Sequence, residues 1–142
     1  MKKYKIGYTT GVFDMFHIGH LNILKRAKEQ CEYLIVGVTT DSLCEARKHK
    51  WPIICETDRM AIVGAIKYVD SVVQQDNMNK IEAVKKHGAN VVFVGSDWKG
   101  TSAWTKYERE LAEIGCDVVY LEHTDSISST ILRERLNEQD DI

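Results

Sequence analysis

Short apolar runs recur along this chain, and longer segments with helical spacing of apolar residues separate them. The runs predict five strands, at residues 4–10, 33–38, 68–73, 91–94 and 118–121. In the second, fourth and fifth runs, apolar residues follow one another directly instead of alternating with polar ones. Such continuous apolarity is typical of strands that are buried on both faces, as in a parallel sheet.

The intervening segments predict five helices, over residues 21–29, 57–67, 79–87, 104–114 and 128–136. Thr57 is a suitable N-cap for the second helix. Gly88 and Gly115 are typical stops for the third and fourth helices. Ser128 or Ser129 is expected to begin the last one.

Strands and helices therefore alternate along the chain. This order predicts the α/β class, with a Rossmann-like, doubly wound sheet of about five parallel strands and helices on both faces. The 142 residues are enough for a single domain spanning 1–142. Ligands of such sheets bind at the carboxyl ends of the strands, near the point where the strand order switches. One long connection, residues 40–56, has no predicted element.

Composition limits the class of protein. Apolar residues make up 44% of the chain and charged residues 28%, as in ordinary globular proteins. The net charge of −2 argues against a broad basic surface for nucleic acid. No apolar run approaches the ~18 residues of a membrane span, and the N-terminus lacks the apolar stretch of a signal peptide. We therefore expect a cytoplasmic protein that neither binds nucleic acid nor inserts into a membrane.

The four cysteines, Cys31, Cys44, Cys55 and Cys116, show no CxxC spacing. Cys31 and Cys116 flank apolar strands, so we expect them to be small core hydrophobes. A reduced protein is the simplest interpretation, and a disulfide framework is the alternative.

Two histidines, His17 and His20, stand between the first predicted strand and the first predicted helix. A helix N-terminus offers free N–H groups and the positive end of the helix dipole, which suits an anion. Gly19 would let a phosphate approach the backbone, while two ring N–H donors could follow charge on that phosphate. We therefore predict a phosphate site, with ordinary helix-start histidines as the plain alternative. A zinc site would need a third ligand that the spacing does not supply.

The turn before these histidines supports the same site. Gly11 would allow a tight turn and Phe13 would pack beneath it. Asp14 would either orient a histidine or cap the backbone.

Hydroxyl groups cluster in a second segment, residues 123–130, between the last strand and the last helix. Hydroxyls and backbone N–H groups at a helix start can donate to phosphate oxygens together. Plain N-capping would need only one hydroxyl. The cluster of Ser128, Ser129 and Thr130 therefore favours phosphate contact.

The string GVFDMFHIGH at residues 11–20 resembles the signature of the HxGH nucleotidyltransferases. Among these, the chain most resembles the cytidylyltransferases, especially those acting on glycerol 3-phosphate. The resemblance covers nearly the whole chain. It includes, in order, the basic stretch RKHK at residues 47–50 of the long connection, ETDR at 56–59, YVD at 68–70, GSDW at 95–98 and ISST at 127–130.

The resemblance implies a set of site residues. The catalytic groups would be His17, His20, Arg59 and Lys50. The nucleotide would contact Gly11, Val12, Phe13, Asp14, Gly19, Asp97, His123, Thr124, Ser126, Ile127, Ser128, Ser129 and Thr130. Arg47, Lys48 and Lys80 would bind the acceptor, because charge-assisted contacts to phosphate are strong.

Several of these assignments leave alternatives open. A cationic loop is often only a solvated surface, and Lys80 could be a surface lysine. Asp97 could accept from an exocyclic amine or a ribose hydroxyl. Trp98 could stack on a ring or close the core, whereas Trp51 and Trp104 are assigned to packing.

The chain departs from the cytidylyltransferase pattern in the C-terminal segment. His123 stands where that pattern has arginine, and Ser126 stands where it has glycine. A histidine cannot make the bidentate fork of an arginine. ISST followed by Arg133 also resembles the adenylyltransferase branch, so the nucleotide base and the acceptor stay open.

The expected reaction is cytidylyl transfer from CTP to a small phosphorylated alcohol, glycerol 3-phosphate first, giving CDP-glycerol and pyrophosphate. Catalysis would rest on positioning and charge stabilisation, without a covalent intermediate. Mg²⁺ would arrive with the triphosphate, with no metal site built from the protein. The resemblance also implies a homodimer. The alternatives are an adenylyltransferase, a choline or ethanolamine phosphate acceptor, and a nucleotide sensor without turnover.

Overall fold

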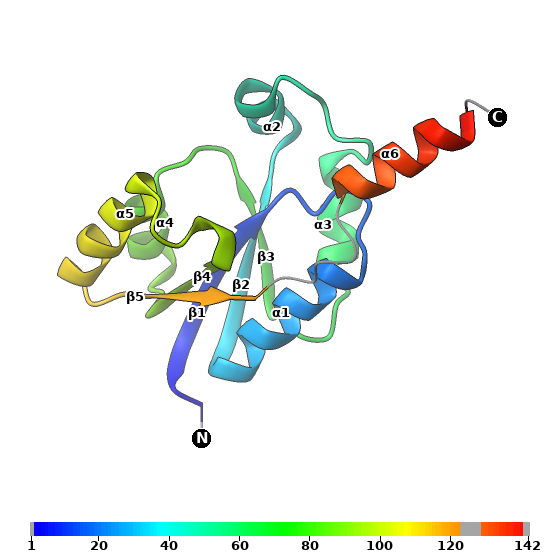
Figure 1. The fold of residues 1–142 in the computed structure, drawn as a ribbon. Coiled ribbons are helices and arrows are strands. Elements are labelled where there is room, and N and C mark those ends of the chain that lie inside the picture. Colours follow the sequence, from blue (N-terminus) through cyan, green and yellow to red (C-terminus); the bar gives the residue numbers. More distant parts are fainter. Residues whose placement is uncertain (1, 123–128, 141–142) are drawn as a thin grey trace.

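A five-stranded parallel sheet forms the centre of the computed structural model, which describes residues 2–122 and 129–140 (Figure 1). The strand order is β3-β2-β1-β4-β5. The strands are β1 (Tyr4–Gly11), β2 (Cys31–Thr39), β3 (Ser71–Gln75), β4 (Val91–Gly95) and β5 (Asp117–Leu121). Every pairing within it is parallel. The predicted doubly wound sheet is therefore confirmed.

Helices connect the strands. They are α1 (Ile18–Gln30), α2 (Asp41–Lys48), α3 (Glu56–Gly64), α4 (Lys80–His87), η1 (Ser96–Trp98), α5 (Ser102–Glu113) and α6 (Ser129–Asp140). None of the described helices is long and apolar enough to cross a membrane.

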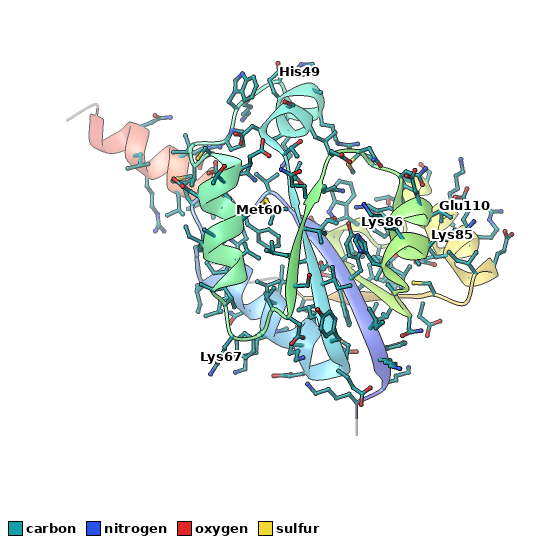
Figure 2. The ribbon with its side chains drawn as sticks, turned by 180° about the vertical axis from the view of Figure 1, so that it is seen from behind. His49, Met60, Lys67, Lys85, Lys86 and Glu110 are labelled. Carbon is teal, nitrogen blue, oxygen red and sulfur yellow. The ribbon has the colours of Figure 1, made fainter. Side chains whose placement is uncertain are left out.

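The helices cover both faces of the sheet, and each face has its own core. Leu24 of α1 and Val63 of α3 pack on one side, in the cluster that includes Phe93. Val84 of α4 and Leu111 of α5 pack on the other side. Figure 2 shows α3, which carries Met60, and α4, which carries Lys85 and Lys86, on either side of the strands.

Several local predictions are confirmed. Gly88 ends α4 in the left-handed region at φ 67°, as predicted. The structure adds an N-cap, since Asn79 accepts from the Glu82 N–H. Cys31 and Cys116 are buried, and all four cysteines are free. Trp104 is buried, whereas Trp51 is 61% exposed and its assignment to packing is wrong.

Three local predictions differ from the structure. Helix α2 occupies the connection left without an element. Thr40 caps it by accepting from the Leu43 N–H, and Cys44 is its one buried residue. Helix α3 begins at Glu56, so Thr57 lies inside the helix and is not its N-cap. The Asp41 and Glu56 carboxylates instead accept from each other's backbone N–H groups. Strand β3 begins at Ser71 and not at residue 68 as predicted. The Asp70 carboxylate, just before the strand, accepts from the Leu34 N–H of β2.

The strand order places a switch point beside β1. This strand pairs with β2 on one side and with β4 on the other. The chain moves from β1 outward through β2 to β3 and then returns to β4 across the sheet. The crevice at the carboxyl ends of β1 and β4 is therefore the place where this topology binds ligands.

Candidate active site

The turn after β1 is held in a strained conformation. Phe13 and Met15 have φ values of 55° and 49°, in the left-handed region that non-glycine residues seldom adopt. Phe13 is buried, and a Cβ added at Gly11 would lie 3.0 Å from its ring. The predicted packing of Phe13 beneath Gly11 is therefore confirmed. Such strain persists only where surrounding packing enforces it, and it often marks functional sites.

His17 and His20 begin helix α1 and cap it with their own rings. His17 is the N-cap, and its Nδ1 accepts from the Gly19 N–H at 3.1 Å. The His20 Nδ1 accepts from the His17 N–H at 3.3 Å. The two rings are stacked, with centroids 3.9 Å apart and planes 21° apart. The glycine between them is buried.

This capping decides which ring nitrogens carry protons. A nitrogen that accepts a hydrogen bond has no proton, so each neutral ring carries its proton on Nε2. The His17 Nε2 is buried and has no hydrogen-bond partner among the described residues. An unpaired buried donor is costly and calls for an explanation. An acceptor supplied by a ligand would satisfy it.

Burial keeps both imidazoles neutral. It lowers the pKa of His17, and together with the nearby His17 ring it lowers the pKa of His20 to about 4. The rings of Phe13 and Phe16 lie 5.4 Å and 5.3 Å from the His20 ring. The two histidines are therefore neutral N–H donors at neutral pH in the free protein.

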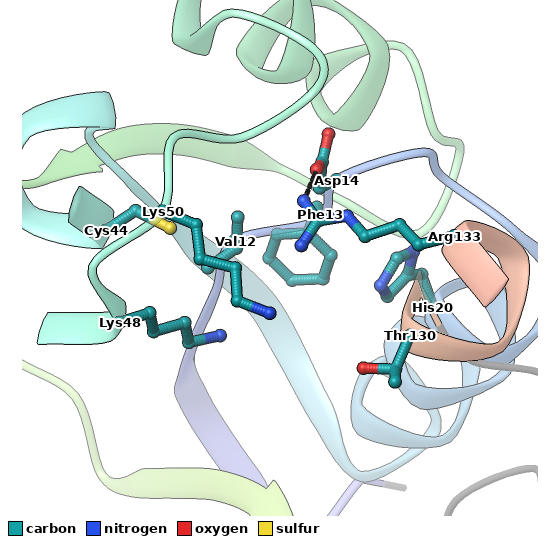
Figure 3. Close-up of a pocket in the computed structure, with 9 residues that line it drawn as sticks. All are labelled: Val12, Phe13, Asp14, His20, Cys44, Lys48, Lys50, Thr130 and Arg133. Carbon is teal, nitrogen blue, oxygen red and sulfur yellow. Dashed lines mark hydrogen bonds and ion pairs between the residues drawn. The ribbon is translucent and has the colours of Figure 1, made fainter. Parts of the chain in front are cut away.

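Two pockets meet at His20. The first, here called the lysine pocket, has a volume of about 250 Å³ and lies between the β1–α1 turn, α2 and α6 (Figure 3). Its lining residues are Val12, Phe13, Asp14, His20, Cys44, Lys48, Lys50, Thr130 and Arg133. Figure 3 shows the Lys48 and Lys50 amines facing the space across from His20 and Thr130. The lysine pocket thus joins cationic groups to a histidine donor.

The second pocket, here called the switch-point pocket, has a volume of about 180 Å³. It is lined by the ends of β1 and β4 together with His20, Lys80, Trp98 and Trp104. It shares Val12, Phe13 and His20 with the lysine pocket. Small-molecule sites are expected at this place in the topology.

Lys80 is a buried cation in the switch-point pocket. It is only 5% exposed, and its Nζ donates to the Thr10 Oγ1 at 2.8 Å. Its Nζ also lies 5.9 Å from the centroid of the Trp104 ring. Burial, with a contribution from Arg47, lowers the pKa of Lys80 to about 8. The alternative of a surface lysine is therefore wrong.

Asp14 binds two backbone N–H groups and an arginine. Its carboxylate accepts from the Ile53 and Ile54 N–H groups, both at 2.8 Å, and pairs with Arg133 at 2.6 Å. Burial raises the pKa of Asp14, but these three donors outweigh it and hold that pKa below its usual range. Of the two predicted roles, backbone capping is the one observed among these contacts.

Comparison with known proteins bears on this geometry. The sequence matches the family described as cytidylyltransferase-like over residues 8–135.

The chain belongs to the cytidylyltransferase-like family.

Its relatives span nearly its whole length. A glycerol-3-phosphate cytidylyltransferase from Bacillus spizizenii (strain ATCC 23059 / NRRL B-14472 / W23) is 36% identical, over 89% of this chain and 92% of the relative. One from Staphylococcus aureus (strain NCTC 8325 / PS 47) is 33% identical, over 93% and 95%. A lipopolysaccharide core biosynthesis protein from Thermoplasma volcanium GSS1 is a structural neighbour with a TM-score of 0.74 at 27% identity, covering 86% of this chain and 99% of its own.

This cytidylyltransferase-like site brings together only some of the predicted residues. His20, Lys48, Lys50 and Thr130 line the lysine pocket, and Lys80 lines the other. Arg47 is exposed and acts on Lys80 through its charge. Asp97 is exposed just beyond β4 and lines neither pocket. His123, Thr124, Ser126, Ile127 and Ser128 lie outside the described residues, and Ser129 is described only as the first residue of α6.

One aromatic and one basic residue, Trp98 and Arg133, have clearer roles in the structure than in the sequence. Trp98 is 48% exposed and lines the switch-point pocket, so the alternative that it closes the core is wrong. Arg133 lines the lysine pocket, although it was not among the predicted site residues. The signal for it was the ISST pattern followed by an arginine.

Arg59, predicted as a catalytic group, lies in the protein interior. It is 1% exposed and lines neither pocket. Its guanidinium donates to the carbonyls of Val12, Thr39 and Ile54 at 2.7, 2.7 and 2.8 Å. A fourth bond at 2.6 Å reaches the Asp41 carboxylate. Arg59 thus joins the β1–α1 turn to the end of β2 and to the start of α2. Its guanidinium N–H groups donate to groups of the protein itself.

Metal ligands are not grouped in the part of the chain that the structure describes: no three His, Cys, Asp or Glu side chains could together hold an ion. The Asp14 carboxylate, the acidic group nearest the two histidines in sequence, already binds two amides and Arg133.

We expect Arg59→Ala to lower the free energy of unfolding by about 3–5 kcal/mol, the usual cost of removing one partner of a buried ion pair. Urea unfolding without substrate measures this. A variant as stable as wild type, with lost turnover, would instead return Arg59 to a catalytic role.

We expect the His20 ring to stay neutral until the pH approaches 4, as followed by the NMR signals of its ring. An unfolded chain takes up this proton near 6.5. The free energy of unfolding should therefore fall as the pH drops from about 6.5 toward 4. Titration of His20 near 6.5 would contradict this.

Proposed function

We propose that this chain transfers a cytidylyl group from CTP to glycerol 3-phosphate, releasing pyrophosphate and forming CDP-glycerol. The relatives named glycerol-3-phosphate cytidylyltransferase support this substrate pair, at 33–36% identity over most of the chain. The observation that carries the chemistry is the unpartnered, buried His17 Nε2 beside His20 at the start of α1.

The reaction is a single displacement at phosphorus. An oxygen of the acceptor's phosphate forms a bond to the α-phosphorus of CTP, and the bond from that phosphorus to the bridging oxygen of pyrophosphate breaks. Negative charge moves onto the α-phosphoryl oxygens and the leaving group. The Nε2–H donors of His17 and His20 would stabilise this charge, and their capping bonds hold them ready before the reaction.

The lysines would hold two strongly anionic substrates together. Lys48 and Lys50 face the lysine pocket, and Lys80 lines the switch-point pocket. Ammonium groups bind phosphate through charge-assisted hydrogen bonds. Fixing both substrates in line converts a bimolecular reaction into an effectively unimolecular one.

Mg²⁺ is part of this proposal as a companion of the triphosphate, where it would neutralise charge on the β- and γ-oxygens. A homodimer and a cytoplasmic location are further proposals, which rest on the resemblance and on the composition of the chain.

Adenylyl transfer is the second candidate. An FAD synthase from Thermococcus sibiricus (strain DSM 12597 / MM 739) is 36% identical, over 83% of this chain and 81% of the relative. Arg133, which continues the ISST pattern of that branch, lines the lysine pocket. Another acceptor is raised by a relative from Encephalitozoon cuniculi (strain GB-M1), named as a probable ethanolamine-phosphate cytidylyltransferase. It is 33% identical, over 72% of this chain and 32% of the relative, and makes ethanolamine phosphate an alternative.

A pyrophosphate-release screen of four nucleoside triphosphates against phosphorylated alcohols tests the proposal. We expect the highest kcat/KM with CTP and glycerol 3-phosphate. His17→Ala and His20→Ala should each lose about 10²–10³ in rate, the usual effect of removing one preorganised donor. A preference for ATP would favour the second candidate, and near-normal rates in either folded variant would remove the histidine mechanism.

We expect kcat/KM for glycerol 3-phosphate to fall as the pH rises through about 8, because Lys80 then loses its charge in the free enzyme. In Lys80→Arg the guanidinium stays protonated, so the fall should move to higher pH. Identical pH profiles for the two proteins would exclude Lys80 from acceptor binding.

A further inference from the structure

One buried carboxylate joins three segments that are far apart in the sequence. Asp14, in the β1–α1 turn, is 3% exposed. Its Oδ2 accepts from the Ile53 N–H and from Arg133 of α6, while its Oδ1 accepts from the Ile54 N–H. The Asp14 carboxylate, here called the anchor, therefore joins the β1–α1 turn, the α2–α3 loop (residues 49–55) and α6. Figure 3 shows the Arg133 end of this arrangement beside the lysine pocket.

The loop is held from both sides at this anchor. Asp14 binds its N–H groups, and the Arg59 Nε donates to the Ile54 carbonyl at 2.8 Å. Arg59 is itself bonded to the Val12 carbonyl in the same turn. Lys50, which lines the lysine pocket, lies in this loop, and Lys48 directly precedes it. The position of both lysines therefore depends on how firmly residues 53–54 are held.

Arg133 connects this anchor to the pocket itself. One of its Nη atoms pairs with Asp14, whereas its Nε is buried and has no hydrogen-bond partner among the described residues. Because the guanidinium also lines the lysine pocket, an anion there could accept from its remaining donors. Such an anion would leave the Asp14 pair intact and would fix the arginine from a second side.

We propose that Asp14 is a positioning residue that couples α6 to the α2–α3 loop, so that a polyphosphate bound beside Arg133 tightens the loop that positions Lys48 and Lys50. The first substrate would then prepare the site for the second. This deepens the proposed function, on which the identity of the substrates rests. A purely structural ion pair would stabilise the fold equally with and without an anion.

Amide hydrogen exchange at Ile53 and Ile54 tests this coupling without any turnover. The probe is inorganic tripolyphosphate, titrated to saturation as judged by chemical-shift changes in the same spectra. In the wild-type protein we expect it to slow exchange of both amides by about fivefold or more, the lower end of usual couplings between sites.

Arg133→Met should abolish this slowing, because its side chain bridges neither Asp14 nor an anion. Asp14→Asn should bind tripolyphosphate through the intact Arg133 while the Ile54 amide gains no protection. Arg135→Met is the matched control: Arg135 lies two residues away on the exposed side of α6, and its variant should behave as wild type.

Two results would overturn the coupling. One is exchange in the wild-type protein that does not change when tripolyphosphate is added. The other is equal slowing in Arg133→Met or Asp14→Asn. Because the probe has no base, ribose or acceptor, a failed substrate screen would overturn the proposed function and leave this measurement valid.

Discussion

Reciprocal capping between His17 and His20 is the interaction on which the site depends. The Nδ1 of each ring accepts a hydrogen bond from a backbone N–H at the start of α1, so each Nε2–H stays available as a donor. Protonation of Nδ1 would cost a cap, and burial already disfavours the charge. One local arrangement thus begins the helix, fixes the tautomers and leaves two N–H donors available, and His20 lines both pockets. Catalysis by positioned donors requires this kind of preorganisation.

The fold and the centre of the site could be predicted from the sequence because their signals are local. Continuous apolar runs identified the strands, and the alternation with helices identified the doubly wound sheet. The position of His17 and His20 between a strand and a helix was enough to place them at its ligand-binding edge. The strain at Phe13 and Met15 could not be predicted, because packing from other segments enforces it.

What the sequence could not supply was the burial of charged residues. Arg59, Lys80 and Asp14 resemble surface charges in the sequence, yet all three are buried and bonded to segments distant along the chain. Arg59 was assigned to catalysis from the resemblance, but its partners are three backbone carbonyls and the Asp41 carboxylate. The same limit explains α2, whose N-terminal Asp41 is held by Glu56 and Arg59 rather than by neighbours in its own helix.

Charge is thereby divided between two tasks in this protein. Arg59 and Asp14 hold the turn, the loop and α6 in register, whereas Lys48, Lys50 and Lys80 face the two pockets that meet at His20. The most direct test is a crystal structure with a non-hydrolysable CTP analogue. The account predicts the Nε2 atoms of His17 and His20 within about 2.7–3.1 Å of phosphate oxygens, the range of preorganised donors. A polyphosphate bound elsewhere, with the His17 Nε2 still unpaired, would contradict it.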